Sequence, residues 1–98
     1  MGNGVERHVT FHVSPDKVEE FEQFFQDEYR PAMANTTGFI KAELLKDKEN
    51  PQDLQMVLRF ESSEAAENWR ASDSHAALKP HLKSLYNGSD LKVYEFIA

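Results

Sequence analysis

The chain has 98 residues, which leaves room for one domain with one hydrophobic core. It contains no cysteine, so disulfides, thiolate zinc sites, iron–sulfur clusters and cysteine nucleophiles are excluded. The formal net charge of −6 disfavours nucleic acid and anionic membranes as partners. No segment has the pattern of a signal peptide or a transmembrane helix, so we expect a cytoplasmic protein.

The first predicted elements are a strand and a long amphipathic helix. Residues 1–5 are expected to be a flexible start, and residues 6–98 a single domain. Apolar and polar side chains alternate over residues 7–13, which predicts a strand. Ser-Pro-Asp at residues 14–16 supplies an N-cap, a helix-starting proline and a first-turn acid, so a helix is predicted over residues 15–32. Its apolar stripe consists of Val18, Phe21, Phe25 and Tyr29, with Phe24 beside it.

The middle of the chain has the pattern of a hairpin. Strands are predicted over residues 39–46 and 54–61, and residues 47–53 form a polar turn between them. A serine pair at residues 62–63 can then cap a helix over residues 64–71. Its continuation is capped by Ser72 or Asp73, and Pro80 near the middle predicts a kink or a break.

A last strand is predicted over residues 91–97. The order strand, helix, strand, strand, helix, strand indicates an α+β ferredoxin-like fold, β-α-β-β-α-β, with an antiparallel four-stranded sheet and both helices on one face. The opposite, open face is expected to carry His8, Thr10, His12, Gln55, Val57 and Arg59. The last strand adds either Lys92, Tyr94 and Phe96, which we favour, or Leu91, Val93 and Ile97. This mixture of apolar and polar groups is typical of a ligand pocket, or of a merely amphipathic sheet surface. A second copy covering it would bury the aromatic rings, so a homodimer is expected.

The segment from Phe60 to His75 resembles the antibiotic biosynthesis monooxygenase superfamily of dimeric α/β barrels. In that family the third strand ends in an aromatic residue followed by Glu-Ser. A helix then carries Ala, a Trp or His, a Ser, and an aromatic residue or His. The matching residues here are Phe60, Glu61, Ser62, Ala65 or Ala66, Trp69, Ser72 and His75. The helix start at residues 15–21 and the pair Gly38-Phe39 also match, so the resemblance covers roughly residues 6–97.

This resemblance implies a cofactor-independent monooxygenase, without metal or flavin, acting on a small aromatic, quinol or anthrone-like substrate. Trp69 is then expected to be the wall of the pocket and a hydrogen-bond donor, although it can equally be a core aromatic. His75 or His12 is the expected proton acceptor, and a solvent-exposed His75 is the alternative. The expected substrate-binding residues are His8, Arg59, Tyr94 and Phe96, with Arg59 stabilising an anion or forming an edge salt bridge.

Other functions stay open. The Cβ atoms of His8 and His12 are expected roughly 13 Å apart along one strand, too far to bind one metal. A haem-degrading activity is a distant alternative, because Trp69 matches that branch while Lys79 stands where its haem-binding histidine is expected. A non-catalytic small-molecule-binding or stress-responsive dimer is the main rival, and a purely structural interface domain predicts no cavity at all.

Overall fold

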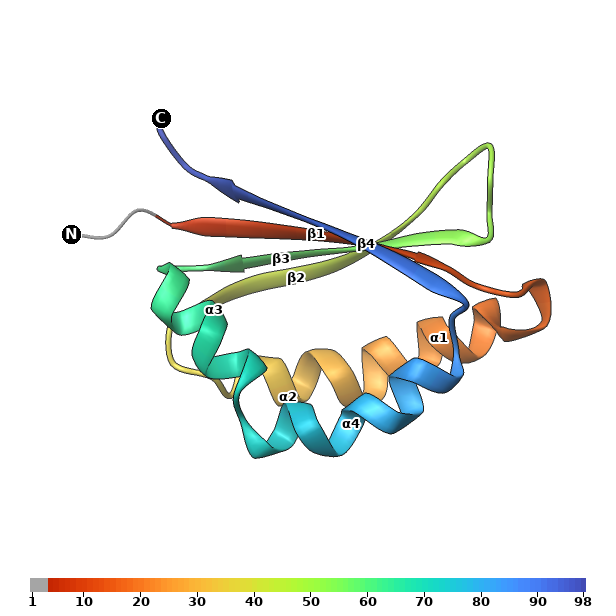
Figure 1. Cartoon of the computed structure of the whole chain (residues 1–98), viewed down its shortest axis with the longest axis horizontal. Helices are drawn as coiled ribbons and strands as arrows, with labels where there is room; N and C mark the ends of the chain where they lie inside the picture. The colour runs from red at the N-terminus through yellow and green to blue at the C-terminus, as the bar shows by residue number, and fades with distance from the viewer. Residues whose placement is uncertain (1–3) are drawn as a thin grey trace.

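The computed structural model describes residues 4–98, in which four strands form an antiparallel sheet with helices along one face (Figure 1). The strands are β1 (Val5–His12), β2 (Phe39–Lys46), β3 (Asp53–Phe60) and β4 (Gly88–Glu95). They lie in the order β2-β3-β1-β4, so the predicted α+β ferredoxin-like fold is confirmed. The predicted flexible start falls mainly on residues 1–3, outside the described residues, whereas Val5 already belongs to β1.

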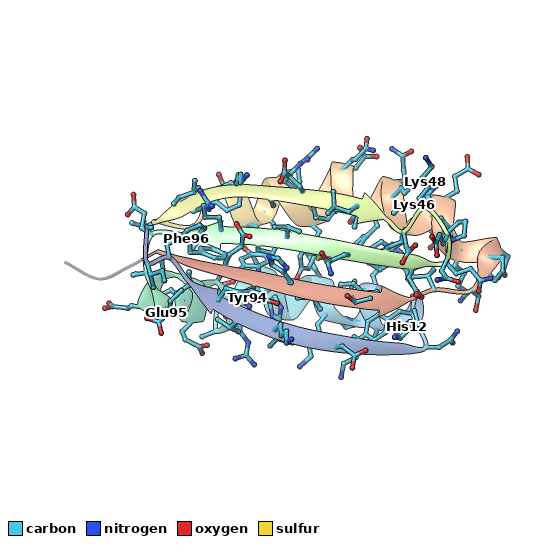
Figure 2. All side chains as sticks on the ribbon, turned by 90° about the horizontal axis from the view of Figure 1, so that it is seen from above. His12, Lys46, Lys48, Tyr94, Glu95 and Phe96 are labelled. Atoms are coloured by element: carbon cyan, nitrogen blue, oxygen red, sulfur yellow. The ribbon has the colours of Figure 1, made fainter. Side chains whose placement is uncertain are left out.

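The pairing register determines which side chains share a face of the sheet. His8 lies opposite Val57 of β3 and Lys92 of β4. Because successive strand residues point to opposite faces, the even-numbered residues of β1 and β4 share the open face with the odd-numbered residues of β3. The predicted assignment of Tyr94 to this face is therefore correct, and Figure 2 shows the face from above.

The first helical segment continues from Pro15 to Ala34 but changes its winding. It consists of η1 (Pro15–Lys17), α1 (Val18–Phe24), the π-helical η2 (Phe25–Tyr29) and α2 (Arg30–Ala34). Besides Phe24, its buried aromatic and methionine side chains are Phe21, Phe25, Tyr29 and Met33, which repeat every four residues. In an α-helix of 3.6 residues per turn, that repeat would drift by roughly 40° per step. The wider π turn holds more residues, so it keeps Tyr29 facing the sheet.

The second helical segment is divided at Ser72, as predicted, but it is not divided again at Pro80. α3 (Ser63–Arg70) ends before Ser72, and α4 (Asp73–Ser84) runs through Pro80 without interruption. The break predicted as one alternative at Pro80 is thus wrong. Proline removes the hydrogen bond to the carbonyl group four residues earlier, on Ala76. Both residues are exposed, so water can satisfy that carbonyl group and the helix continues.

The core lies between the sheet and the helices, and its largest fully buried side chains are Trp69, Phe21, Phe25, Phe60, Met33, Leu54 and Met56. Gly38 fixes the entry of the chain into β2, because its φ of 87° lies in the left-handed region that favours glycine. A Cβ atom at this position would lie 2.6 Å from the Cβ of Ala65 on α3. Within residues 4–98, no helix is long and apolar enough to cross a membrane.

Candidate functional site

A cavity of about 250 Å³ lies between the helix-facing side of the sheet and the helices. Strands β1 and β3 supply its apolar floor, and η2, α3 and α4 supply its walls. It is lined by Arg7, Val9, Phe11, Tyr29, Met56, Leu58, Trp69, Arg70, His75, Lys79, Leu82, Lys83, Tyr86, Ser89 and Leu91. A purely structural interface domain was expected to have no cavity, so the presence of this cavity disfavours that alternative.

Three rings meet at one side of the cavity. The ring centroid of Trp69 lies 5.2 Å from that of His75 and 5.5 Å from that of Tyr29, both edge to face. Tyr29 and His75 are also close, with their centroids 6.3 Å apart. Trp69 and Tyr29 are buried, whereas His75 is partly exposed. Such edge-to-face contacts hold the rings in fixed orientations around the space between them.

The joint between α3 and α4 places Trp69 and His75 side by side. The Ser72 hydroxyl donates a hydrogen bond to the Trp69 carbonyl oxygen at 2.7 Å. The same hydroxyl accepts a hydrogen bond from the backbone N–H of His75 at 3.1 Å, as the N-cap of α4. Ser72 therefore ties the end of one helix to the start of the next. The spacing Trp-Ser-His, three residues apart each time, is what this joint requires.

Burial and charge keep the imidazole of His75 neutral. Burial lowers the pKa of His75, and the positive charges of Lys79, Arg70 and Arg7 lower it further. Burial raises the pKa of Tyr29, although hydrogen bonding with Trp69 and the charge of Arg7 partly oppose this shift. At neutral pH the cavity thus offers a neutral imidazole that can accept a proton beside a protonated phenol that can donate a hydrogen bond.

The sequence-based prediction missed several of the cavity's polar residues, among them Arg7 and Tyr29. Arg7 has the same parity on β1 as Val9 and Phe11, and this parity was the signal that it faces the helices. Tyr29 was read only as part of the apolar stripe, although its hydroxyl group distinguishes it from the phenylalanines of that stripe.

The structure does not bring the seven predicted site residues together. Trp69 and His75 line the cavity. His8, His12, Arg59, Tyr94 and Phe96 lie on the open face of the sheet instead, because the alternation of strand side chains places them there. The expectation that His12 or Arg59 shares a pocket with Trp69 is therefore corrected.

On the open face these residues contact one another. The rings of His8 and Tyr94 lie 4.7 Å apart. The Arg59 guanidinium lies 3.8 Å from the centroid of the Phe96 ring and donates a hydrogen bond to Glu6 at 3.2 Å. Two roles were expected for Arg59, an anion-binding group or a partner in an edge salt bridge. In the structure its guanidinium pairs with Glu6 and lies over the Phe96 ring.

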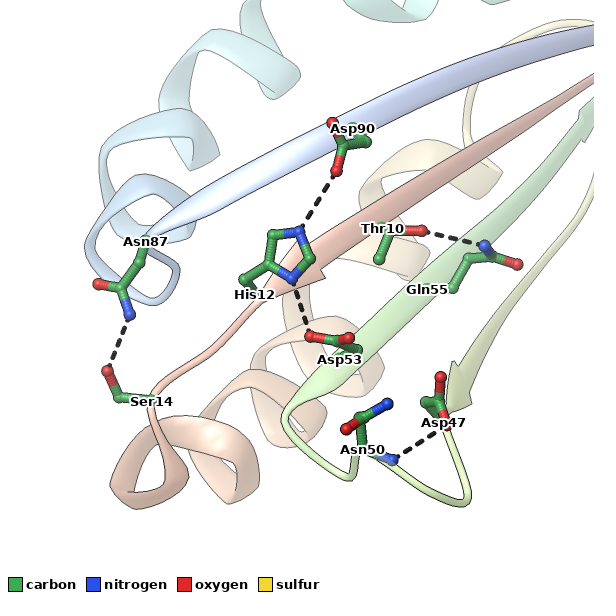
Figure 3. A network of polar contacts seen from close by, with 9 residues as sticks. All are labelled: Thr10, His12, Ser14, Asp47, Asn50, Asp53, Gln55, Asn87 and Asp90. Atoms are coloured by element: carbon green, nitrogen blue, oxygen red, sulfur yellow. Dashed lines mark hydrogen bonds and ion pairs between the residues drawn. The ribbon is translucent and has the colours of Figure 1, made fainter.

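His12 lies between two carboxylates at one end of the open face (Figure 3). Its Nδ1 is 2.8 Å from Asp53 of β3, and its Nε2 is 3.3 Å from Asp90 of β4. Hydrogen bonds with Asp53 and then Asp90 raise the pKa of His12. Even so, no group of three His, Asp or Glu side chains among residues 4–98 is placed to hold a metal ion.

Comparison with known proteins identifies the family and the fold. The sequence model of the family "Antibiotic biosynthesis monooxygenase" matches residues 5–80. Among curated proteins, none is significantly similar in sequence to this chain.

Several solved structures have the same fold at low sequence identity. SnoaB of Streptomyces nogalater, a cofactor-independent oxygenase, superimposes with a TM-score of 0.87 at 18% identity, over 99% of this chain and 96% of that chain. A Caulobacter crescentus CB15 protein, provisionally assigned as an antibiotic biosynthesis monooxygenase, gives 0.88 at 18% identity, over 99% and 92%. A conserved protein of Methanosarcina mazei Go1 gives 0.85 at 19% identity, over 94% and 91%.

Proposed function

Because the chain belongs to the antibiotic biosynthesis monooxygenase family, we propose that it oxygenates a small aromatic, quinol or anthrone-like compound without a cofactor. The observation that carries this proposal is the position of the His75 imidazole, partly buried in a cavity beside the rings of Trp69 and Tyr29. Burial and nearby positive charges lower the pKa of this imidazole. A base with a pKa below its ordinary value accepts protons from acidic substrates at neutral pH without itself being protonated beforehand.

The reaction needs no external reductant. His75 removes a proton from an acidic phenol or from the methylene group of an anthrone, and the resulting electron-rich anion donates electrons to molecular oxygen. One oxygen atom remains on the substrate as a new carbonyl oxygen. The other leaves as water with the two hydrogens that the substrate carbon and hydroxyl, or the methylene group, give up. Atoms and electrons therefore balance between one substrate molecule and one O₂.

The other two rings have supporting roles in this proposal. Trp69 supplies a flat wall for an aromatic substrate, and its indole N–H hydrogen-bonds with the Tyr29 hydroxyl and so helps to hold that group in place. Tyr29 stays protonated because burial raises its pKa, so its hydroxyl can donate to the anion as negative charge develops. Both side chains are buried and held by neighbouring rings, and such fixed donors need little rearrangement during the reaction.

Oxygen uptake by the purified protein tests this proposal. A panel of naphthalene quinols and anthrone is supplied in the presence of a metal chelator and without flavin, and the rate is compared with the uncatalysed rate. We expect His75→Gln and Trp69→Phe to lower the rate at least about tenfold. The matched control is His81→Gln, since His81 is also on α4 but pairs with Glu20 outside the cavity and should keep the wild-type rate.

The pH profile separates a base from a merely structural histidine. The rate should rise with pH as His75 loses its proton, with a midpoint below the ordinary histidine value of about 6.5. His75→Gln should remove this limb of the profile. Uptake no faster than the uncatalysed rate for every compound contradicts the proposal, and binding without uptake would then favour the non-catalytic module.

We also propose that the protein is a homodimer formed through the open face of the sheet. Apolar side chains are exposed there, among them Leu45 at 50% and Tyr94 at 46%. A single sheet face in water is normally plainly polar, and covering this one removes apolar surface from solvent. Analytical ultracentrifugation should give twice the monomer mass for the wild type and a monomer for Tyr94→Glu, and a monomeric wild type contradicts the dimer.

A further inference from the structure

Positive charge is concentrated around the cavity although the chain as a whole is acidic. Arg7, Arg70, Lys79 and Lys83 line it, which is 4 of the 11 lysines and arginines, and no Asp or Glu is among its lining residues. The net charge of the chain is −6. A cleft lined by one sign of charge and walled by apolar groups raises the local concentration of oppositely charged ligands. This cavity is therefore suited to an anion.

Arg7 is the most enclosed of these charges. It lies on β1 opposite Leu58 and Val93, and only 11% of its side chain is exposed. Among the residues that the structure describes, the carboxylate paired with it is that of Glu67, at 4.0 Å. Glu67 is 64% exposed and lies closer to Arg70, at 3.2 Å. The partner of the largely buried Arg7 guanidinium is thus distant and is shared with Arg70. A second anion close to Arg7 would stabilise this buried charge.

We propose that the cavity binds a small aromatic compound carrying a carboxylate, with the carboxylate on Arg7 and the ring against Trp69 and Tyr29. The planar fork of the guanidinium matches a carboxylate through two parallel hydrogen bonds. The volume of about 250 Å³ lies just below the usual range for ligand pockets and fits a compound of one or two rings. This inference rests on the proposed function for the site and specifies its substrate class.

The position of Arg7 relative to the other groups supports this arrangement. Arg7, Tyr29 and His75 line the same cavity, so the guanidinium, the phenol and the imidazole face one space. A ring whose carboxylate is held by Arg7 would therefore lie in the space that Tyr29 and His75 also line. Lys79 and Lys83 are exposed at the rim, where they can attract the anion before it enters.

Binding of two matched probes tests the proposal. Isothermal titration calorimetry compares 1-hydroxy-2-naphthoate with 1-naphthol, which has the same rings and hydroxyl group but no carboxylate. At low salt we expect the wild type to bind the naphthoate at least about tenfold more tightly. The preference should shrink as salt is added, because part of it is attraction by the exposed lysines. Equal affinity for the two probes overturns the proposal without any variant.

Substitution of the arginine identifies its contribution. Arg7→Met keeps roughly the length of the side chain and should abolish the preference for the naphthoate over 1-naphthol. The control Lys48→Met removes the same charge from the β2–β3 loop and should keep the preference. If Arg7→Met does not fold, as judged by circular dichroism, Arg70→Met should reduce the preference at least about threefold. A folded Arg7→Met protein with the wild-type preference overturns the proposal.

This test is independent of oxygenation. A clear preference for the naphthoate without oxygen uptake from any compound contradicts the proposed function and leaves the carboxylate site intact. Oxygen uptake from neutral quinols with no preference for the naphthoate has the opposite meaning, because it supports the oxygenase and removes the carboxylate site.

Discussion

Replacement of Gly38 by alanine tests how the loop between α2 and β2 positions the cavity wall. The backbone of Gly38 has a φ of 87°, and an added Cβ would lie 2.6 Å from the Cβ of Ala65. Ala65 is one turn before Trp69 on the same helix, so a shift of α3 that relieves the contact also moves the indole ring.

Three effects decide the size of the change in stability. A residue with a Cβ in the left-handed region costs about 1–2 kcal/mol relative to glycine. Relieving a contact much shorter than real Cβ atoms make costs about 1–3 kcal/mol more, as for other overpacked sites. The lower entropy of alanine in the unfolded chain offsets about 0.4–1 kcal/mol. We therefore expect Gly38→Ala to lower the free energy of unfolding by about 3 kcal/mol, or the Tm by about 15 °C.

Urea denaturation followed by fluorescence measures this change, because Trp69 is the single tryptophan of the chain. Gly88→Ala is the matched control, since its Cβ would meet only the His12 ring at an ordinary 3.6 Å. The control should stay within about 0.5 kcal/mol of the wild type. A Gly38→Ala protein equally close to the wild type would refute the conformation of this loop and the placement of α3.

Three further outcomes are expected. Hydrogen bonds with Asp53 and Asp90 raise the pKa of His12, so the contribution of His12 to stability is present below about pH 6.5 and is lost as the pH rises through the higher folded-state pKa. In urea titrations the stability advantage of the wild type over His12→Gln should therefore shrink over that range, and a constant difference contradicts this. Pro80→Ala should raise the Tm, because it restores a helix hydrogen bond at an exposed position, and a lower Tm in thermal melts argues against an uninterrupted α4. Phe21→Ala removes a fully buried ring and should cost about 4 kcal/mol, so an unchanged urea midpoint would exclude this core.

The order and type of the main elements follow from local patterns in the sequence. The alternation in the first strand, the proline at residue 15 and the polar turn before β3 each act over a few residues, so they can be read without a tertiary structure. Ser14 stands at the predicted helix start, but its side chain makes no capping hydrogen bond. The assignment of Tyr94 to the open face also follows from period-two alternation once the strand is recognised. The same local pattern contained the signal for Arg7, which was not used.

The composition of the cavity was decided by tertiary structure. Trp69 and His75 belong to one segment, so their proximity needs only the joint at Ser72. Tyr29 reaches them from the first helical segment through the π turn of η2, and Arg7 reaches them from β1 through the register of that strand. The same register places His12 on the opposite face of the sheet. Local sequence patterns fix which way a side chain points from its own element. Only the packing of elements distant in the chain decides which of those side chains meet, because that packing minimises the exposed apolar surface of the whole molecule.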